Sequence, residues 1–392
     1  NEKKYNLPEE VKYCTKCVNS NQRPRITFDE NGVCSACNFA DFKNNQIDWE
    51  ARRKELHILC DKHRKNDGSY DCIVPSSGGK DSALVAHMLK YEFNMNPLTT
   101  TWAPHLYTDI GFQNHQAHIH SGNLANILVT PPGDVHRRLT KLAFENLGDP
   151  FLPFIFGQNN MPLQMSVRYD VSLIFYGENS EVEYGGNVHD AYRPTRDWKF
   201  KNTKILMSGM PPEEFLKHGI TDKDIFQYLP PEKKKLEKLK TEIHYFGYYH
   251  KWNPQENYYY CVENTGFKAN PVRSEGTYSK YASLDDKLDG FHYYLMFIKF
   301  GFGRATSDAA HEVRDGNITR DEARTLVGRF DGEFPEKNFE TFLKYCDISK
   351  KTFWEVVDSW RPKHVWKKVD DKWLLRHKVD KSGVDDWSIN ES

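Results

Sequence analysis

The segment 76–82 carries the residue types of a phosphate-binding loop. It reads Ser-Ser-Gly-Gly-Lys-Asp-Ser, and it lies between an apolar run at 71–75 and a helical pattern at 83–89. A strand, a glycine turn and a helix start direct backbone N–H groups at one point, where they stabilise an anion. Glycine lets the backbone approach a phosphate without a Cβ, while hydroxyls donate hydrogen bonds and an ammonium adds charge. The residues that supply these features are Ser77, Gly78, Gly79, Lys80 and Ser82.

The loop differs from the Walker A pattern, because Val74 and Asp81 stand where that pattern needs Gly and Ser or Thr. Ser-Gly-Gly-Lys-Asp-Ser at 77–82 instead resembles the SGGxDS loop of the PP-loop ATP pyrophosphatases. The resemblance implies a doubly wound α/β domain that cleaves ATP between its α- and β-phosphates, with Mg²⁺ spreading the charge. It also implies which residues hold the pyrophosphate end of ATP, namely Ser77, Gly78, Gly79, Asp81 and Ser82.

Four of the eight cysteines have the spacing of a metal site. Cys14, Cys17, Cys34 and Cys37 form two C-x2-C pairs separated by sixteen residues, and a hairpin turn is predicted at 29–32. This spacing predicts a closed, structural Zn²⁺ site. Two disulfides, free thiols or an iron–sulfur cluster are the alternatives. We expect the remaining cysteines to be buried packing residues; they are Cys60, Cys72, Cys261 and Cys346.

The elements around the loop alternate between strand and helix. Strands are predicted at 71–75, 97–103, 125–130 and 171–176, and helices at 83–89, 109–121 and 135–146. We predict an N-terminal zinc module over 1–48, a doubly wound parallel α/β domain over 49–205 and a mainly helical domain over 206–392.

Ligands of such sheets bind beyond the carboxyl ends of the strands. Trp102, Gly177 and Glu178 follow two predicted strands and should therefore face the same crevice as the loop. We interpret them as further nucleotide-binding residues. The turn Gly177-Glu178-Asn179 resembles a Gly-His-Asn turn of PP-loop enzymes, with Glu in place of His.

The C-terminal third offers candidates for the second substrate. Arg304 directly follows the turn 301–303, which leaves its guanidinium suited to a phosphate or carboxylate. Arg273, Lys280 and Lys287 are further cations there, although surface ion pairing is the alternative for each. Ser283 is predicted to begin a helix, with Asp286 completing a capping box. The charged segment 232–240 is predicted to be a solvated helix.

The order of these motifs resembles one enzyme family. A four-cysteine module, SGGKDS, and the segments 275–278, 283–294 and 297–306 together look like the N-acetyl sugar amidotransferases of bacterial surface-polysaccharide and nonulosonate pathways. The likeness spans Tyr13 to about Asp331. It implies that an acetamido group of an N-acetylated sugar becomes an acetamidino group. We expect the sugar to be nucleotide-linked, and we expect adenylation of the acetamido oxygen followed by its replacement with ammonia and release of AMP. Lys80, Asp81 and Arg304 are the residues we predict to be catalytic.

Ammonia needs a source that the chain lacks by sequence. Cys34 in Gly-Val-Cys-Ser-Ala is a near match to a glutaminase elbow, but it is already assigned to the metal. The resemblance implies a separate glutaminase subunit with a cyclase-like subunit, similar to the pair in imidazole glycerol phosphate synthase.

A tRNA-thiolating PP-loop enzyme is the alternative function. This alternative predicts a cysteine pair within the α/β domain, yet no cysteine lies between Gly78 and Asn202. It also predicts a basic surface, whereas 54 Lys and Arg against 55 Asp and Glu give a net charge of −1. Over 392 residues, no apolar run is long enough for a membrane span. We expect a cytoplasmic enzyme that binds no nucleic acid.

Overall fold

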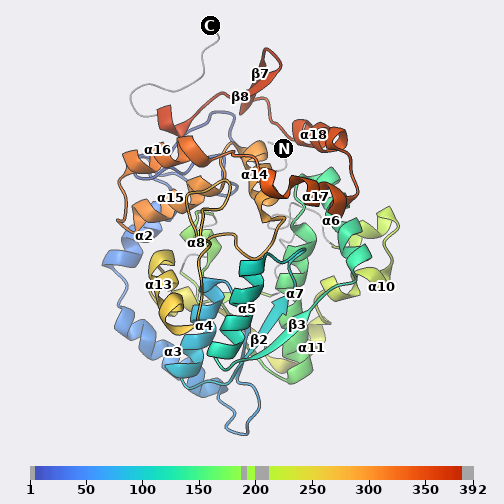
Figure 1. Ribbon diagram of the computed structural model, residues 1–392. Coiled ribbons are helices and arrows are strands. Elements are labelled where there is room, and N and C mark those ends of the chain that lie inside the picture. Colours follow the sequence, from blue (N-terminus) through green and yellow to red (C-terminus); the bar gives the residue numbers. More distant parts are fainter. Residues whose placement is uncertain (1–4, 187–191, 199–211, 382–392) are drawn as a thin grey trace.

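A six-stranded sheet forms the centre of the protein. The computed structural model describes residues 5–186, 192–198 and 212–381 (Figure 1). The sheet has the order β3-β2-β1-β4-β6-β5. Its strands are β1 (Cys72–Pro75), β2 (Pro97–Trp102), β3 (Ala125–Val129), β4 (Leu173–Tyr176), β5 (Thr195–Arg196) and β6 (Glu242–Tyr245). The first four and β6 run parallel, and β5 pairs antiparallel with β6 at the edge.

The strand order creates a switch point between β1 and β4. From β1 the chain continues to β2 and β3 on one side, and it then returns to β4 on the other side of β1. Connections therefore leave β1 and β4 in opposite directions, which opens a crevice at their carboxyl ends. The loop 76–82 follows β1 and the turn 177–179 follows β4, so the topology brings both predicted segments to that crevice.

Helices cover both faces of the sheet, which explains why its strands are apolar throughout. Within β1, Cys72 and Val74 pack into the core of one face and Ile73 into the core of the other. The first face is covered by α3 (Trp49–His63), α4 (Lys80–Tyr91), α5 (Asp109–Ser121) and α13 (Pro254–Asn264). The second is covered by α6 (Gly133–Leu147), α7 (Leu152–Tyr169) and α11 (Lys233–Leu239). Short elements connect them: α8 (Ser180–Glu183), η2 (Pro212–His218), α10 (Asp222–Ile225), η3 (Phe226–Tyr228) and α12 (Phe246–Tyr249).

The α/β unit extends further along the chain than the sequence indicated. The predicted boundary at 205–206 lies outside the described residues, but β6 pairs with β4 and α13 packs over β1 and α4. The sheet therefore recruits its fifth parallel strand from residues 242–245. Four residues within a polar, aromatic stretch carry too little periodicity to predict a strand, and the pairing with β4 is what makes them one.

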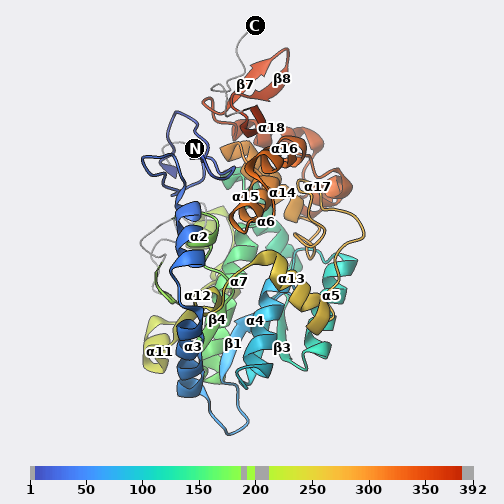
Figure 2. The ribbon, with the colours of Figure 1, turned by 90° about the vertical axis from the view of Figure 1, so that its left-hand side faces the viewer.

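A helical layer caps the end of the α/β unit near the crevice (Figures 1 and 2). Its core is rich in phenylalanine, and Phe291, Phe342 and Phe353 are fully buried. The layer contains α14 (Asp289–Phe300), α15 (Arg304–Arg314), α16 (Arg320–Phe330), η4 (Glu336–Asn338), α17 (Phe339–Cys346) and α18 (Lys350–Ser359). A hairpin of β7 (Trp366–Val369) and β8 (Lys372–Leu375) and the turn η5 (Val379–Lys381) follow.

The predicted helix start at Ser283 is wrong. Ser283 has a φ of +55°, and α14 begins at Asp289. Asp286, the expected capping-box residue, accepts hydrogen bonds from the backbone N–H and the Nδ1 of His105, each at 2.7 Å. Tertiary partners for the carboxylate thus replace the local cap that the sequence pattern favoured. The charged segment 232–240 is helical as predicted, since α11 covers most of it.

The N-terminal segment lies beside the helical cap, while α2 (Ser35–Asn45) and α3 run down along the α/β unit (Figure 2). The predicted turn at 29–32 is present: Gly32 has a φ of +72° and its N–H donates to the carbonyl of Asp29. An isolated antiparallel bridge between Phe28 and Cys34 closes this hairpin. The fold class is thus an α/β unit with a parallel sheet, an N-terminal four-cysteine cluster and a helical C-terminal region. Across the described ranges, the helices are too short or too polar to cross a membrane.

Candidate functional site

The loop after β1 is shaped by Gly78. This residue has a φ of +89°, a conformation that residues with a Cβ rarely adopt. A Cβ at Gly78 would lie 2.5 Å from the Cα of His115 and 2.6 Å from its backbone nitrogen. Gly78 therefore lets the loop pack directly against α5, and the loop then enters α4 with Gly79 as the N-cap. The result is the open helix N-terminus that the sequence predicted.

A hydrogen-bond network beneath the loop fixes its course. The hydroxyl of Ser76 lies 3.0 Å from the hydroxyl of Ser82 and 3.0 Å from Nε2 of His118. Ser82 donates to the carbonyl of Gly79 at 3.1 Å, and Thr101 on β2 donates to the carbonyl of Ser76 at 2.5 Å. Burial lowers the pKa of His118 to about 3, so this imidazole supports the loop without a charge.

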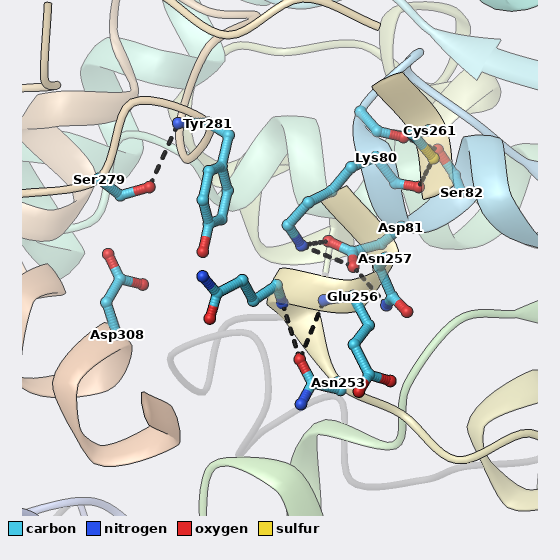
Figure 3. Close-up of polar contacts among 12 residues, drawn as sticks. Lys80, Asp81, Ser82, Asn253, Glu256, Asn257, Cys261, Ser279, Tyr281 and Asp308 are labelled. Carbon is cyan, nitrogen blue, oxygen red and sulfur yellow. Dashed lines mark hydrogen bonds and ion pairs between the residues drawn. The ribbon is translucent and has the colours of Figure 1, made fainter. Parts of the chain in front are cut away.

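Lys80 and Asp81 form a close ion pair at the start of α4. The Lys80 ammonium lies 2.6 and 2.7 Å from the Asp81 carboxylate oxygens, and Asn257 on α13 donates to the same carboxylate at 3.2 Å (Figure 3). Tyr281 lies opposite the Lys80 ammonium, which is 5.8 Å from the centre of its ring. The lysine charge is therefore balanced by its own neighbour along the chain.

The loop separates two cavities. The larger one has a volume of about 990 Å³ and lies over the carboxyl ends of β1, β2 and β4. This volume is at the upper end of the range typical of small-molecule sites. The residues predicted to bind nucleotide, apart from Gly78, line it: Ser77, Gly79, Asp81, Ser82, Trp102, Gly177 and Glu178.

Two carboxylates at the switch point face this larger cavity. Burial and the neighbouring charge of Asp81 raise the pKa of Glu178 to about 7. A cation between Asp81 and Glu178 would relieve this repulsion, and carboxylate and hydroxyl oxygens are the donors that Mg²⁺ prefers. The donor set therefore fits Mg²⁺, and the adjacent helix N-terminus and loop N–H groups fit a nucleotide triphosphate.

The smaller cavity, of about 160 Å³, lies on the other side of the loop. One polar face of α15 lines it, opposite Gly78, Lys80 and Asp81. The α15 residues of this face are Arg304, Ser307, Asp308, His311 and Glu312, followed by Asp315. They recur at intervals of three and four, which is the signature of a single helix face. Of these residues only Arg304 is predicted from the sequence, although the spacing of the other polar residues is equally visible there.

Arg304 is the predicted substrate cation that the structure brings to the loop. Its Nε donates to Asp308 at 2.9 Å and its Nη1 to the hydroxyl of Tyr293. Arg273, in contrast, forms a bidentate pair with Glu333 at 2.6 and 2.7 Å, outside both cavities. The other candidate cations, Lys280 and Lys287, line neither cavity. The catalytic residues we predicted, Lys80, Asp81 and Arg304, all line the smaller cavity.

The four predicted metal ligands converge. The Sγ atoms of Cys14, Cys17, Cys34 and Cys37 all lie within 4.8 Å of one another, with Cys14 and Cys37 3.9 Å apart and Cys17 and Cys34 3.7 Å apart. Four sulfurs at the Zn–S distance in a tetrahedron are about 3.8 Å apart. The cluster therefore fits a closed tetrahedral Zn²⁺ site. The other four cysteines are free and buried, as predicted.

The cysteine cluster is joined to the helical cap. Arg320, the first residue of α16, donates three hydrogen bonds of 2.9–3.2 Å to the carbonyls of Cys14 and Cys17. Ala309 and Ala310 of α15 pack into the same buried cluster as the cysteines. The apolar face of α15 thus rests on the cysteine module, and its polar face lies against the loop.

Comparison with protein families matches the C-terminal part of the chain. Residues 275–379 match the family model described as LPS biosynthesis protein WbpG-like, C-terminal domain. This range includes Arg304 and the whole of α15.

Matches with individual proteins are partial. An uncharacterised protein of Methanocaldococcus jannaschii is 32% identical over 86 residues, which are 22% of this chain and 30% of that protein. The chain therefore spans less than a third of the length of this curated relative. An NH3-dependent NAD synthetase of Campylobacter jejuni has 15% identity and a TM-score of 0.30, covering 50% of this chain and 93% of that chain. An NMN synthetase of Francisella tularensis has 12% identity and a TM-score of 0.28, covering 53% and 94%.

Proposed function

We propose that this protein is an ATP-dependent amidotransferase, which converts the acetamido group of an N-acetylated sugar into an acetamidino group. The observation that carries the proposal is the position of the SGGKDS loop at the switch point, between a nucleotide-sized cavity and a small cavity with polar walls. A loop with a cavity on each side suits an enzyme in which ATP activates one substrate and a second substrate then attacks the activated species.

The chemistry explains the need for ATP. An amide carbonyl is a poor electrophile, and its oxygen is a poor leaving group. Attack of this oxygen on the α-phosphorus of ATP forms an O–P bond and releases pyrophosphate. The adenylated amide then has AMP as a good leaving group, and ammonia attacks its carbon. The protein must position the reactants, stabilise charge and keep out water, which would regenerate the amide.

The described residues have matching roles in this scheme. Ser77, Gly79 and Ser82 would hold the phosphates with hydroxyls and backbone N–H groups at the start of α4. Asp81 and Glu178 would hold Mg²⁺, which neutralises phosphate charge when bound. Lys80 and Arg304 line the smaller cavity beside the loop, where they would stabilise the negative charge of the departing groups.

The similarity of residues 275–379 to a domain of lipopolysaccharide biosynthesis proteins supports a surface-glycan sugar as the substrate. A nucleotide-linked sugar is the form we favour. We also propose that a separate glutaminase subunit with a cyclase-like partner supplies the ammonia in the cell.

The test is a nucleotide and pyrophosphate assay of the purified chain with ammonium chloride and an N-acetylated sugar. UDP-N-acetylglucosamine and free N-acetylglucosamine are suitable first probes. AMP and pyrophosphate should appear together with a sugar in which NH has replaced one acetyl oxygen, detected by mass spectrometry. Formation of ADP and orthophosphate in place of AMP and pyrophosphate would contradict the proposal.

A further inference from the structure

The polar face of α15 is unusual because it faces inward. The opposite face, which contains Ala309 and Ala310, is also buried. A helix buried on both sides normally has apolar residues on both. Here the second side is buried at His311 and half-buried at Asp308 and Glu312, and it presents carboxylates and an imidazole to a cavity. Asp308 is paired with Arg304 and accepts a hydrogen bond from Thr277 at 2.6 Å, which offsets the cost of burying its charge.

His311 on this face has a ring nitrogen that makes no hydrogen bond within the described residues. It is 5% exposed and lines the smaller cavity, and its Nε2 has no hydrogen-bond partner within the described part of the chain. The ring of Tyr184 lies beside it, with the two ring centres 4.7 Å apart. Among the described histidines that have a buried ring nitrogen without a partner, His311 is the one that lines the smaller cavity, so a ligand there can reach its Nε2.

Burial and the surrounding cations keep the His311 imidazole neutral. Burial lowers its pKa well below the usual value, and so do nearby cations from four segments, namely Arg314, Lys43, Lys80 and Arg23. Acidic groups of the same helix face, Asp308, Glu312 and Asp315, also line the cavity. A neutral imidazole accepts a hydrogen bond at its unprotonated ring nitrogen, and it does not repel a cationic ligand.

The cavity itself selects for a small cation. Its volume of about 160 Å³ is below the range of about 300–1,000 Å³ that drug-sized ligands occupy. Five carboxylates line it against two cations; the acids are Asp81, Asp285, Asp308, Glu312 and Asp315, and the cations are Lys80 and Arg304. The rings of Tyr184 and Tyr281 add electron-rich faces to the wall, and such faces attract cations.

We propose that the smaller cavity binds ammonium and that His311 accepts a hydrogen bond from the bound nitrogen and positions it for attack beside the loop. The inference rests on the proposed amidotransferase function and assigns its nitrogen site. Exposed Asn317 also lines the cavity, which gives ammonium a route from the surface to the loop.

The proposed step balances as follows. Ammonium loses one proton to solvent while its nitrogen stays hydrogen-bonded to His311, and the freed nitrogen lone pair forms a C–N bond to the adenylated carbon. The bond from that carbon to the AMP oxygen breaks, and AMP leaves with the electron pair. The extra N–H proton of the adduct goes to the AMP phosphate, so the product is the amidinium ion.

Binding is tested without the sugar. In two-bond 1H–15N spectra of the full-length protein, the His311 imidazole signals should be those of a neutral ring and should shift saturably with ammonium chloride. The variant His311→Gln assigns these signals, and tetramethylammonium chloride controls for ionic strength, because that ion cannot donate a hydrogen bond to the imidazole. Unchanged His311 signals in ammonium chloride would overturn the ammonium site.

Catalysis is tested by separating the two half-reactions. In His311→Leu, exchange of pyrophosphate into ATP, which needs the acceptor alone, should be unchanged. Transfer of nitrogen should fall by roughly 10²-fold, in line with the loss of a contact that positions a reactant. The KM for ammonium should rise, because the hydrogen bond to the bound nitrogen is lost. The matched control is His120→Leu, at an exposed position of α5, which should leave both rates unchanged.

The two proposals fail differently. Wild-type protein that shows no acceptor-dependent exchange of pyrophosphate into ATP contradicts the amidotransferase function. Wild-type exchange together with an unaltered nitrogen-transfer rate and an unaltered KM for ammonium in His311→Leu contradicts the role of His311 alone.

Discussion

At the scale of single residues, Gly78 and Asp81 define the loop, one through backbone shape and the other through charge. Gly78 has a positive φ, and it also has no room for a Cβ, because the backbone of His115 fills that space. The carboxylate of Asp81 accepts hydrogen bonds from Lys80 and Asn257, and Asp81 lines both cavities.

The first prediction concerns Gly78. Gly78→Ala should lower the free energy of unfolding by about 1–3 kcal/mol more than Gly68→Ala does, in the range of overpacking costs. Gly68 is the matched control, since its φ of +85° resembles the +89° of Gly78, but nothing lies within 4 Å of its Cβ position. Urea denaturation of both variants measures the difference. Equal losses in the free energy of unfolding would mean that α5 shifts to make room for the Cβ at no cost in stability.

The second prediction concerns Asp81. Asp81→Asn should reduce pyrophosphate release to the background rate, because the carboxylate that balances Lys80 and the proposed Mg²⁺ is lost. Far-UV circular dichroism should remain that of the wild type, since the side chain is 39% exposed. Asp67→Asn, in an exposed turn, is the control with the same chemistry. A wild-type rate in Asp81→Asn would remove the loop carboxylate from the mechanism.

At the scale of elements, α14 and α15 carry the cap and connect it to the α/β unit. His292 on α14 pairs at 3.0 Å with Asp149, which lies between α6 and α7. Burial opposes the charge on His292, but the charge and hydrogen bond of Asp149 outweigh it and raise the pKa of His292. Burial likewise opposes the charge on Asp149, but His292 lowers the pKa of this carboxyl. The pair therefore connects the cap to the sheet unit through charge.

The third prediction gives this pair a pH window. A raised histidine pKa stabilises the fold below the unfolded value of about 6.5, and a lowered aspartate pKa stabilises it above about 3.9. Asp149→Asn should therefore lower the free energy of unfolding most between roughly pH 4 and 6.5, and less as the pH rises through the raised pKa of His292. Denaturation at pH 5.5 and at pH 8.5 measures this difference. Asp61→Asn, in the surface pair with Arg64, should show little dependence on pH.

If Asp149→Asn lowers the free energy of unfolding equally at both pH values, the pair stabilises the fold through the shape of its side chains and not through their charge. The neutral amide keeps the size of the carboxylate and can still accept the N–H of Phe151, which now donates at 3.2 Å. The comparison therefore isolates the charge.

At the scale of the whole molecule, the cysteine cluster joins segments that lie far apart in the sequence. It packs with α15 and α16, and Arg320 makes hydrogen bonds to the carbonyls of Cys14 and Cys17. Because α15 also forms a wall of the smaller cavity, the cysteine cluster holds this wall in place through the opposite face of α15, although no cysteine of the cluster lines the cavity.

The fourth prediction follows from that position. Cys34→Ser should lower bound zinc and the unfolding temperature, while pyrophosphate release per folded molecule changes little. Zinc by mass spectrometry, thermal unfolding and the nucleotide assay give the three readouts. Cys60→Ser is the control for replacing a buried thiol, and it should destabilise without loss of zinc. Full zinc stoichiometry in Cys34→Ser would contradict the four-cysteine assignment.

The sequence by itself determined the parts of this protein that depend on neighbours along the chain. The strand, loop and helix from 72 to 91 and the helix 109–121 were predictable, because periodicity and glycine positions are local. The cysteine spacing likewise predicted the cluster. Only the tertiary structure decided the rest. Pairing with β4 makes 242–245 a strand, and Asp286 accepts hydrogen bonds from His105 instead of capping a helix that begins at Ser283. The inward direction of the α15 polar face also depends on packing between distant segments, because a polar stripe has the same sequence pattern whether it meets water or a cavity.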